Sequence, residues 1–232
     1  MIAPEKIKEQ LGKTLDKTDF RGLGEKYAGK VRDNYTKGNR MTIITTDRIS
    51  AFDRVLCTIP FKGQVLNQMA VFWFNKTKDI VRNHMISAPD PNVMVVEKCV
   101  PIPLEMIVRN YVTGVTKTSI WYNYEKGVRN FCGNQLPEGL KKDQKLPEII
   151  LTPTTKAEHG EHDESISPGE IVERGILEKE ELEKLREISF NLFRRGREIA
   201  AKQGIILVDT KYEFGKLGDE IVLIDEIHTP DS

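Results

Sequence analysis

IILVDTKYEFGKLGDEIVLIDE, at residues 205–226, has the composition of two consecutive β-strands, but charged residues interrupt its apolar run. Successive residues of a strand face opposite sides of a sheet, so Asp209, Lys211 and Glu213 share one face. The segment 216–219, with Gly218 and Asp219, supplies residues typical of a hairpin turn. The pattern therefore predicts a hairpin with a charged face on an otherwise apolar strand.

Folding about this turn is expected to bring Asp225 back roughly opposite Lys211, at a cross-strand Cβ separation of about 5 Å. Two carboxylates, Glu213 and Asp225, would then lie close to one ammonium group. Mg²⁺ is usually held by one or two carboxylates together with substrate phosphates, so the hairpin suits a divalent cation with a phosphate ligand. The alternative is a surface hairpin whose charges face water.

Composition excludes several classes of protein. The 232 residues contain 35 basic and 35 acidic side chains, so no net charge favours nucleic acid or a membrane surface as a partner. No apolar run reaches the length of a membrane span, and the N-terminal residues lack a signal-peptide core, so we expect a cytoplasmic protein. Cys57, Cys99 and Cys132 are widely spaced, which favours free thiols over a disulfide framework or a zinc site.

Periodicity predicts both helices and strands along the chain. Apolar residues recur at helical spacing over 63–81 and 179–203, and Ser167 has the spacing of a capping box with Glu170. Gly38-Asn39 predicts a hairpin turn before a strand at 41–45. Further helices are expected at 3–12 and 115–126, and further strands at 93–96 and 104–108.

The order of these elements, mixed strands, then helices, then a hairpin, favours an α+β fold over a doubly wound parallel sheet. Pro101 and Pro103 are expected to interrupt strand pairing and to form a hinge between two lobes, because proline cannot donate to a ladder. The segment 131–165 is predicted to be a long polar loop, of the kind that is often functional.

Two basic residues follow a glycine in YAGKVRDNY, at 27–35. Lys30 and Arg32 are expected on one face of a strand, and Gly29 leaves room for a ligand beside the backbone. This arrangement suits a triphosphate, but it matches no established glycine-rich phosphate motif, and taken alone the local pattern favours solvated basic residues.

Further candidates lie at the ends of strands. Asp47 and Asp53, in TTDRISAFD, are candidates for the same cation or for capping a turn. Arg109 ends an apolar strand before Gly114, which suits an anion bound bidentately, although a salt bridge at the strand end explains it equally well.

The loop sequence LTPTTKAEHGEHDESIS, at 151–167, concentrates histidines and acidic residues beside Lys156. It lacks the cysteines or the helical spacing of a zinc site, so a loop that contacts a small polar substrate fits better.

Taken together, several motifs resemble those of the phosphoribosylaminoimidazole-succinocarboxamide synthase family, the SAICAR synthetases of purine biosynthesis, in the family's order from Gly29 to Ser232. They are GKVRDNY, TDRISAFD, IPFKGQVLNQ, VRNHM, PLEMIVRNYVTG, TPTTKAEHGEHDESIS, DTKYEFG and DEIHTPDS.

The resemblance implies an ATP- and Mg²⁺-dependent ligase. It would condense L-aspartate with carboxyaminoimidazole ribonucleotide (CAIR) through an acyl phosphate, giving SAICAR, ADP and phosphate. It also implies a two-lobe fold. An N-terminal antiparallel β-lobe, 1–99, would lie over an ATP cleft, and a larger α+β lobe, 100–232, would bind substrates and metal and is expected to lack the family's C-terminal helices.

The family's site roles carry over by motif. Lys30 and Arg32 lie in the phosphate-binding strand, Glu97 to Cys99 is the connection whose backbone binds adenine, and Arg109 contacts the ribonucleotide phosphate. Lys211 faces the transferring phosphoryl group or the CAIR carboxylate. The remaining assignments are metal binding for Glu213, Asp225 and Asp53, and aspartate binding for His162 and Asp163.

Val115 departs from the family pattern, because a serine usually follows the glycine there. The serine contact to the substrate phosphate is therefore either missing or supplied by Thr116. Two other functions stay open. A different two-lobe ATP-dependent small-molecule phosphotransferase would turn over without aspartate, and a non-catalytic nucleotide-binding module would bind ATP without turnover.

Overall fold

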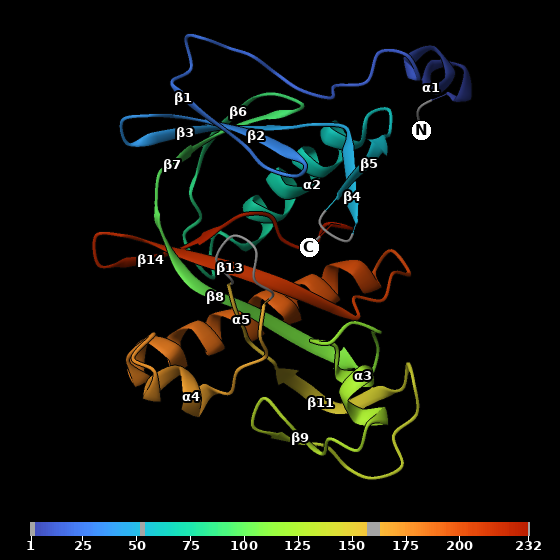
Figure 1. Ribbon diagram of the computed structural model, residues 1–232, viewed down its shortest axis with the longest axis vertical. Coiled ribbons are helices and arrows are strands. Elements are labelled where there is room, and N and C mark those ends of the chain that lie inside the picture. Colours follow the sequence, from blue (N-terminus) through green and yellow to red (C-terminus); the bar gives the residue numbers. More distant parts are fainter. Residues whose placement is uncertain (1–2, 52–53, 157–162, 232) are drawn as a thin grey trace. The chain divides into compact units, whose positions relative to one another are not determined.

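The structure is a computed structural model that describes residues 3–51, 54–156 and 163–231. These residues form two compact units (Figure 1). Unit 1 holds the described residues up to Lys78, together with Asn83–Val100 and Thr229–Asp231, and unit 2 holds Asp79–Arg82 and Pro101–His228. The functional division into 1–99 and 100–232 stays a prediction.

Unit 1 is built on an antiparallel sheet with the strand order β1-β2-β3-β7-β6. The predicted turn at Gly38-Asn39 is confirmed, because Lys37 pairs with Arg40 across it. A separate hairpin pairs β4 with β5. The strands are β1 (Glu25–Ala28), β2 (Arg32–Lys37), β3 (Arg40–Thr45), β4 (Arg48–Ala51), β5 (Arg54–Thr58), β6 (Met85–Asp90) and β7 (Val93–Glu97).

Two helices accompany this sheet. The short α1 (Pro4–Gln10) buries no side chain, whereas α2 (Lys62–Thr77) confirms the predicted helix and buries Leu66, Trp73 and Phe74. The first turn of α2 lies so close to β3 that a Cβ on Gly63 would meet the Thr45 carbonyl oxygen at 2.3 Å. Glycine is therefore required where the helix begins beside the sheet.

The sheet of unit 2 has the strand order β11-β8-β13-β14, and β12 also pairs with β8. The C-terminal hairpin is confirmed, with Leu217 and Glu220 as its closing pair. Thr210, Tyr212 and Phe214 are buried on one face of β13, as the alternation predicts. The strands are β8 (Val100–Tyr111), β11 (Lys145–Leu151), β12 (Thr154–Thr155), β13 (Asp209–Leu217) and β14 (Glu220–Ile224); β9 (Asn130–Phe131) and β10 (Asn134–Gln135) form a separate pair.

Two of the helices in unit 2 follow the predicted positions. The helix α4 (Pro168–Glu173) begins with the predicted capping box between Ser167 and Glu170. The long α5 (Lys179–Ala201) buries an apolar face and lies beside β13, where Lys216 Nζ contacts Glu181 Oε1 at 2.5 Å (Figure 1). In the described part of the chain, we find no helix long and apolar enough to cross a membrane.

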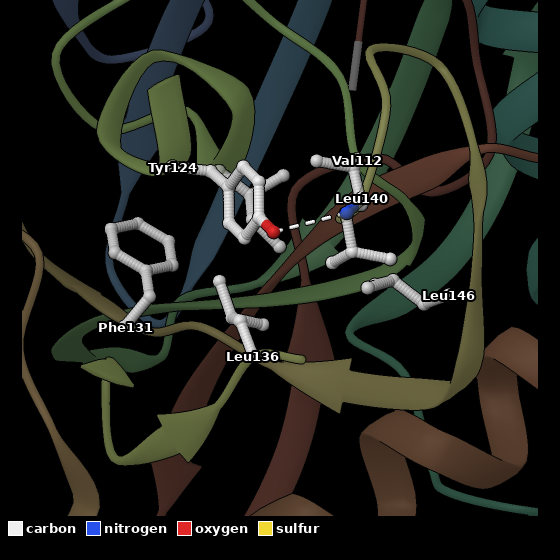
Figure 2. Packing of buried hydrophobic residues seen from close by; sticks show 7 residues of the cluster. Val112, Tyr124, Phe131, Leu136, Leu140 and Leu146 are labelled. Carbon is white, nitrogen blue, oxygen red and sulfur yellow. Dashed lines mark hydrogen bonds between the residues drawn. The ribbon is translucent and has the colours of Figure 1, made fainter. Parts of the chain in front are cut away.

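The prediction of a structureless loop over 131–165 is wrong. This part of the chain contains β-strands and contributes to an apolar cluster with α3 (Ile120–Glu125), shown in Figure 2. Tyr124 is at its centre, where its hydroxyl accepts from Leu140 N at 3.0 Å and donates to the Pro137 carbonyl at 2.8 Å. The buried members are Val112, Ile120, Tyr124, Phe131, Leu136, Leu140 and Leu146.

Two further predictions are corrected. The helix expected over 115–126 begins only at Ile120, after Gly114 has taken a φ of 91° that ends strand geometry. The prolines at 101 and 103 do not interrupt the strand, because both lie inside β8. Proline loses only its donor, and the Pro103 carbonyl still accepts from Lys156 N at 3.2 Å.

The buried His228 fixes the end of unit 2 against α5. Its Nε2 lies 2.7 Å from the Tyr212 hydroxyl, and a Cβ on Gly196 would meet its ring at 2.5 Å. Burial lowers the pKa of His228 to about 3. The folded protein therefore holds this imidazole neutral throughout the ordinary pH range.

We expect His228 to make the folded state sensitive to mild acid. The unfolded chain takes up a proton near pH 6.5, and the folded chain only near pH 3, so stability is lost as pH falls between these values. From about pH 6 to 5, the free energy of unfolding of the wild type should fall by about 1 kcal/mol more than that of His228→Gln. Urea denaturation at both pH values measures this difference, and equal losses would contradict it.

Candidate functional site

Lys211 lies among three carboxylates of unit 2, which come from its own strand β13 (Glu213), from β8 (Glu105) and from the residue that follows β14 (Asp225). Its Nζ is 2.5 Å from Glu213 Oε1, 2.9 Å from Glu105 Oε1 and 3.8 Å from Asp225 Oδ2. Burial alone would lower the pKa of Lys211, but these carboxylates outweigh it and raise the pKa above its usual value. Lys211 is therefore an ammonium ion at neutral pH, which suits it to bind an anionic oxygen rather than to act as a base.

The second oxygens of two of these carboxylates also have partners. Glu213 Oε2 accepts from Lys156 Nζ at 2.5 Å, and Glu105 Oε2 accepts from Thr154 Oγ1 at 3.0 Å. Glu213 is buried, whereas the Lys156 side chain is 46% exposed. The segment that follows β11 therefore adds a cation to the charged face of β13.

Asp225 reaches Lys211 from a position that the sequence did not predict. The β13–β14 ladder ends at the pair Glu213–Ile224, so Asp225 is not paired opposite Lys211. It follows the end of β14 with a φ of 62°, a left-handed conformation that Asp tolerates better than most residues. With this backbone conformation, the Asp225 carboxylate lies 3.8 Å from the Lys211 ammonium group.

Arg109 is a second, buried cationic centre of unit 2. Its Nη1 donates to Asp209 Oδ2 at 2.7 Å, its Nε to Thr152 Oγ1 at 2.8 Å and its Nη2 to the Thr118 carbonyl at 3.1 Å. Burial lowers the pKa of Arg109, an effect that Asp209 opposes. The three partners fix the plane of the guanidinium, and fixed planar geometry is what bidentate recognition of an anion requires.

The segment beside Arg109 contains a serine that the sequence analysis did not select. Ser119 Oγ accepts from Thr116 N at 3.1 Å and lies 2.6 Å from Thr116 Oγ1. A Cβ on Gly114 would meet Ser119 Oγ at 2.4 Å. Gly114 is thus required for the close approach that joins Thr116 and Ser119.

The two basic candidate residues of unit 1, Lys30 and Arg32, lie at the β1–β2 hairpin. Arg32 begins β2, but Lys30 lies in the turn between β1 and β2 rather than on a strand, which corrects the expectation that both share one strand face. Lys30 is exposed and Arg32 is partly buried. The turn itself is closed by a hydrogen bond from Gly29 N to the Arg32 carbonyl at 2.8 Å.

The remaining candidates of unit 1 are at the end of β7 and beside α2. Glu97 and Cys99 are partly buried, and the Glu97 carbonyl accepts from Cys99 Sγ at 3.4 Å. Asp47 is buried and accepts from Leu15 N and Gly63 N at 2.8 and 3.0 Å, so its carboxylate binds backbone amides of two distant segments rather than capping its own turn. Asp53 and His162 lie outside the described residues, and Asp163 is exposed.

The pair Glu213 and Asp225 is compatible with a magnesium ion that takes its other ligands from a substrate. Glu213 and Asp225 each place one carboxylate oxygen near the ammonium group of Lys211, so the two carboxylates lie close to the same point. Carboxylate oxygens are the hard ligands that Mg²⁺ prefers. Within residues 3–51, 54–156 and 163–231, no group of three or more His, Cys, Asp or Glu side chains is arranged to hold a metal ion. A complete protein cage is therefore not formed by these residues, whereas a pair of carboxylates completed by phosphate oxygens is compatible with them.

Comparison with known proteins decides the family. The family model described as SAICAR synthetase matches residues 25–232. The chain belongs to the SAICAR synthetase family.

Relatives agree with this membership of the SAICAR synthetase family. A phosphoribosylaminoimidazole-succinocarboxamide synthase of Legionella pneumophila strain Paris is 52% identical over 211 residues, covering 90% of this chain and 67% of the relative. The enzyme of that name from Vigna aconitifolia, described as chloroplastic, is 54% identical over 91% of this chain. The chain spans 62% of the Vigna aconitifolia relative and 56% of a similar one from Arabidopsis thaliana.

Solved structures of the SAICAR synthetase family share the fold. SAICAR synthase from Saccharomyces cerevisiae, complexed with SAICAR, is 35% identical with a TM-score of 0.82, over 94% of this chain and 78% of that one. A type-2 SAICAR synthetase in complex with ADP is 30% identical with a TM-score of 0.72, over 88% of this chain and 80% of that one. The expected mixed α/β fold with antiparallel sheets is therefore confirmed.

Within this family fold, two residues of the charged cluster were missed by sequence reasoning. Glu105 was not selected, although it is a single charge inside the apolar run Leu104–Val108, which is a usable signal of a special role. Lys156 was noted only as part of an acidic loop. Both contacts join distant segments: Glu105 on β8 meets Lys211 on β13, and Lys156, which follows β12, meets Glu213 on β13.

Proposed function

We propose that this chain catalyses the ATP-dependent condensation of L-aspartate with CAIR, giving SAICAR, ADP and phosphate. The observation that carries the proposal is the cluster around Lys211, in which one ammonium group is flanked by Glu213, Glu105 and Asp225. Membership of the SAICAR synthetase family supports it. The reaction needs a positive charge beside a carboxylate that becomes phosphorylated, together with carboxylates that bind a metal.

The chemistry follows from the poor reactivity of a carboxylate, whose leaving group would be oxide. A carboxylate oxygen of CAIR attacks the γ-phosphorus of ATP, and ADP leaves. The aspartate amine then attacks the acyl carbon, loses a proton, and displaces phosphate as the amide forms. In each step negative charge develops on a departing phosphate oxygen, so positioned cations contribute more than covalent assistance from the protein.

Individual roles are assigned by chemistry. Lys211 binds the transferring phosphoryl group or the CAIR carboxylate, because its ammonium group stays protonated. Glu213 and Asp225 hold Mg²⁺, which neutralises phosphate charge when bound. Arg109 binds the ribonucleotide phosphate, and Thr116 adds a contact there, supported by the short Thr116–Ser119 approach.

Nucleotide contacts are assigned to unit 1. Lys30 and Arg32 bind the ATP phosphates, and the backbone from Glu97 to Cys99 binds adenine. The similar type-2 structure in complex with ADP supports nucleotide binding by this fold. Asp53 as a further metal ligand, and His162 with Asp163 as aspartate contacts, rest on the motif resemblance alone. The cytoplasm stays the predicted location.

The function is tested by ADP release from the purified chain with Mg·ATP, CAIR and L-aspartate, leaving out each component in turn. We expect release that requires CAIR and aspartate together, with formation of an amide product. If ADP is released with CAIR but without aspartate, and a stable phosphorylated product accumulates, the chain would instead be a small-molecule phosphotransferase. Binding of ATP without any turnover would indicate a nucleotide-binding module.

A further inference from the structure

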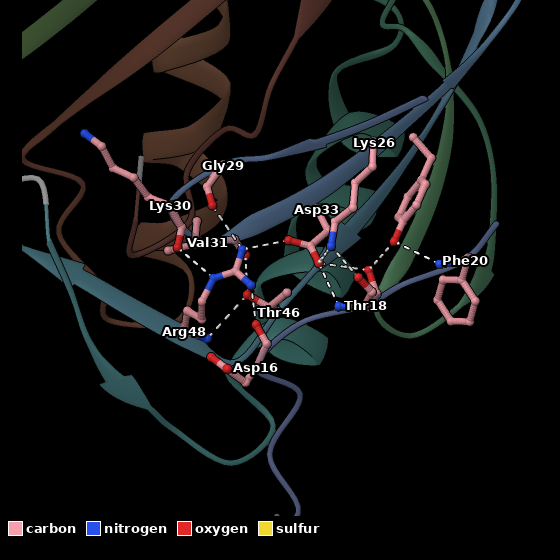
Figure 3. A network of polar contacts seen from close by, with 11 residues as sticks. Asp16, Thr18, Phe20, Lys26, Gly29, Lys30, Val31, Asp33, Thr46 and Arg48 are labelled. Atoms are coloured by element: carbon pink, nitrogen blue, oxygen red, sulfur yellow. Dashed lines mark hydrogen bonds and ion pairs between the residues drawn. The ribbon is translucent and has the colours of Figure 1, made fainter. Parts of the chain in front are cut away.

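Arg48 is a buried arginine of unit 1 that the proposed reaction does not use. It begins β4 and is 7% exposed. Its guanidinium donates to the carbonyls of Gly29 at 3.0 Å and Lys30 at 2.9 Å, and also to that of Asp16 (Figure 3). One side chain therefore holds two successive carbonyls of the β1–β2 turn.

The third carbonyl of this turn is also held. The Val31 carbonyl accepts from Thr46 Oγ1 at 2.7 Å and from Thr46 N at 2.9 Å. All the carbonyls from Gly29 to Val31 thus accept hydrogen bonds from the segment Thr46–Arg48 (Figure 3).

The orientation of the carbonyls determines the orientation of the amides. The described residues contain no cis peptide bond, and in a planar trans peptide the C=O and N–H groups point in opposite directions. Because Arg48 holds the carbonyls of Gly29 and Lys30, the N–H groups of Lys30 and Val31 point away from it. Successive amides that face the same way form a concavity that suits an anion.

Arg48 is itself held in place by Asp33. The Asp33 carboxylate accepts from Arg48 Nη2 at 2.9 Å, from Thr18 N at 2.8 Å and from Thr18 Oγ1 at 2.9 Å, and it pairs with Lys26 at 3.1 Å. Burial alone would raise the pKa of Asp33, but these donors outweigh it and lower the pKa to about 2. The carboxylate stays ionised at neutral pH, so the guanidinium keeps its partner.

We propose that Arg48 is a positioning residue that orients the Gly29–Val31 turn so that the amides of Lys30 and Val31 bind a phosphate group of the nucleotide. This inference rests on the proposed nucleotide-binding role of unit 1, and deepens it by adding backbone donors to the side chains of Lys30 and Arg32. Arg48 does not touch the nucleotide; it acts through the backbone that it holds.

The test compares the affinities for Mg·ADP and for adenosine, measured by calorimetry on the whole chain. Adenosine lacks phosphates, so a misoriented turn should weaken ADP binding alone. Arg48→Lys keeps the positive charge beside Asp33 but loses the planar guanidinium that reaches two carbonyls. We therefore expect the Kd for ADP to rise about tenfold and the Kd for adenosine to rise less than twofold. Thr46→Val removes the hydroxyl that donates to the Val31 carbonyl and accepts from Arg48 N, and it should raise the Kd for ADP about threefold.

Arg54→Lys, at an exposed position on the partner strand β5, is the matched control and should bind both ligands like the wild type. An unchanged ADP-to-adenosine preference in folded Arg48→Lys would overturn the inference, as would an equal loss of both ligands. If Arg48→Lys does not fold, Thr46→Val decides. Wild-type chain that binds adenosine but no ADP, or neither ligand, would overturn the proposed nucleotide site and this inference with it.

Discussion

Replacing Glu213 with Gln is expected to lower the rate of ADP formation by about a thousandfold or more, the scale of losing a central charge-stabilising group. The substitution keeps the shape of the side chain but removes the charge that lies 2.5 Å from Lys211 and from Lys156. It therefore removes a metal ligand in the proposed site. Asp225→Asn should have a similar effect, and Asn also tolerates the φ of 62° at this position.

The measurement is steady-state ADP release at saturating Mg·ATP, CAIR and aspartate, with thermal unfolding as the test of folding. Glu220→Gln is the matched control, because it neutralises a carboxylate of the same hairpin that is 51% exposed and pairs only with Arg82 among the contacts described. The control should keep wild-type activity. A near-normal rate in Glu213→Gln or Asp225→Asn at ordinary Mg²⁺ concentrations would reject the metal assignment of that residue.

Arg109→Ala is expected to weaken CAIR binding by about a hundredfold while leaving ATP binding nearly unchanged, since a hydrogen-bonded buried charge is lost. Arg109 is 6% exposed and is fixed by Asp209, Thr152 and Thr118. Its loss removes the proposed phosphate ligand and leaves Asp209 without this cation. Arg109→Lys, which keeps the charge but not the fork, should fall between the wild type and Arg109→Ala.

Direct binding of CAIR and of ATP, measured separately, distinguishes this role from a general loss of folding. The control is Arg186→Ala, which removes an exposed arginine of α5 whose contact with Glu183 is 3.5 Å long. A surface pair of this kind contributes little to stability. An unchanged CAIR affinity in Arg109→Ala would reject the phosphate assignment, and a parallel loss of ATP binding would indicate a structural role.

The parts of the fold predicted from sequence are those with a clear period. The alternation along 209–214 places Tyr212 and Phe214 in the core and the charged residues on the other face, and helical spacing locates α2 and α5. The capping box at Ser167 is a local signal that depends only on residues three apart. These features are present in the folded protein because the local conformational preference of each segment agrees with the burial of its apolar residues.

The parts that were missed depend on distant contacts. In 131–165, Phe131, Leu136, Leu140 and Leu146 follow no helical or strand period, and they are buried because they meet around Tyr124. The late start of α3 reflects the conformation of Gly114, which periodicity cannot detect.

The candidate site divides in the same way. Lys211 and Glu213 were selected from alternation along one strand, whereas Glu105 joins them through the arrangement of β8 beside β13. Arg48 gave no signal of its own, because its partners Gly29 and Lys30 are separated from it by a whole strand pair. The catalytic, metal and substrate roles themselves stay predictions until they are measured.

The central claim, that the CAIR carboxylate is activated by phosphorylation, is tested most directly by following the heavy oxygen isotope. CAIR labelled at both carboxylate oxygens is turned over with Mg·ATP and L-aspartate, and the released phosphate and amide product are analysed by mass spectrometry. We predict one labelled oxygen in each phosphate and one retained in each amide, because the carboxylate oxygen that attacks ATP leaves with the phosphoryl group. Unlabelled phosphate would contradict the account, since ATP would then be hydrolysed without activating the carboxylate.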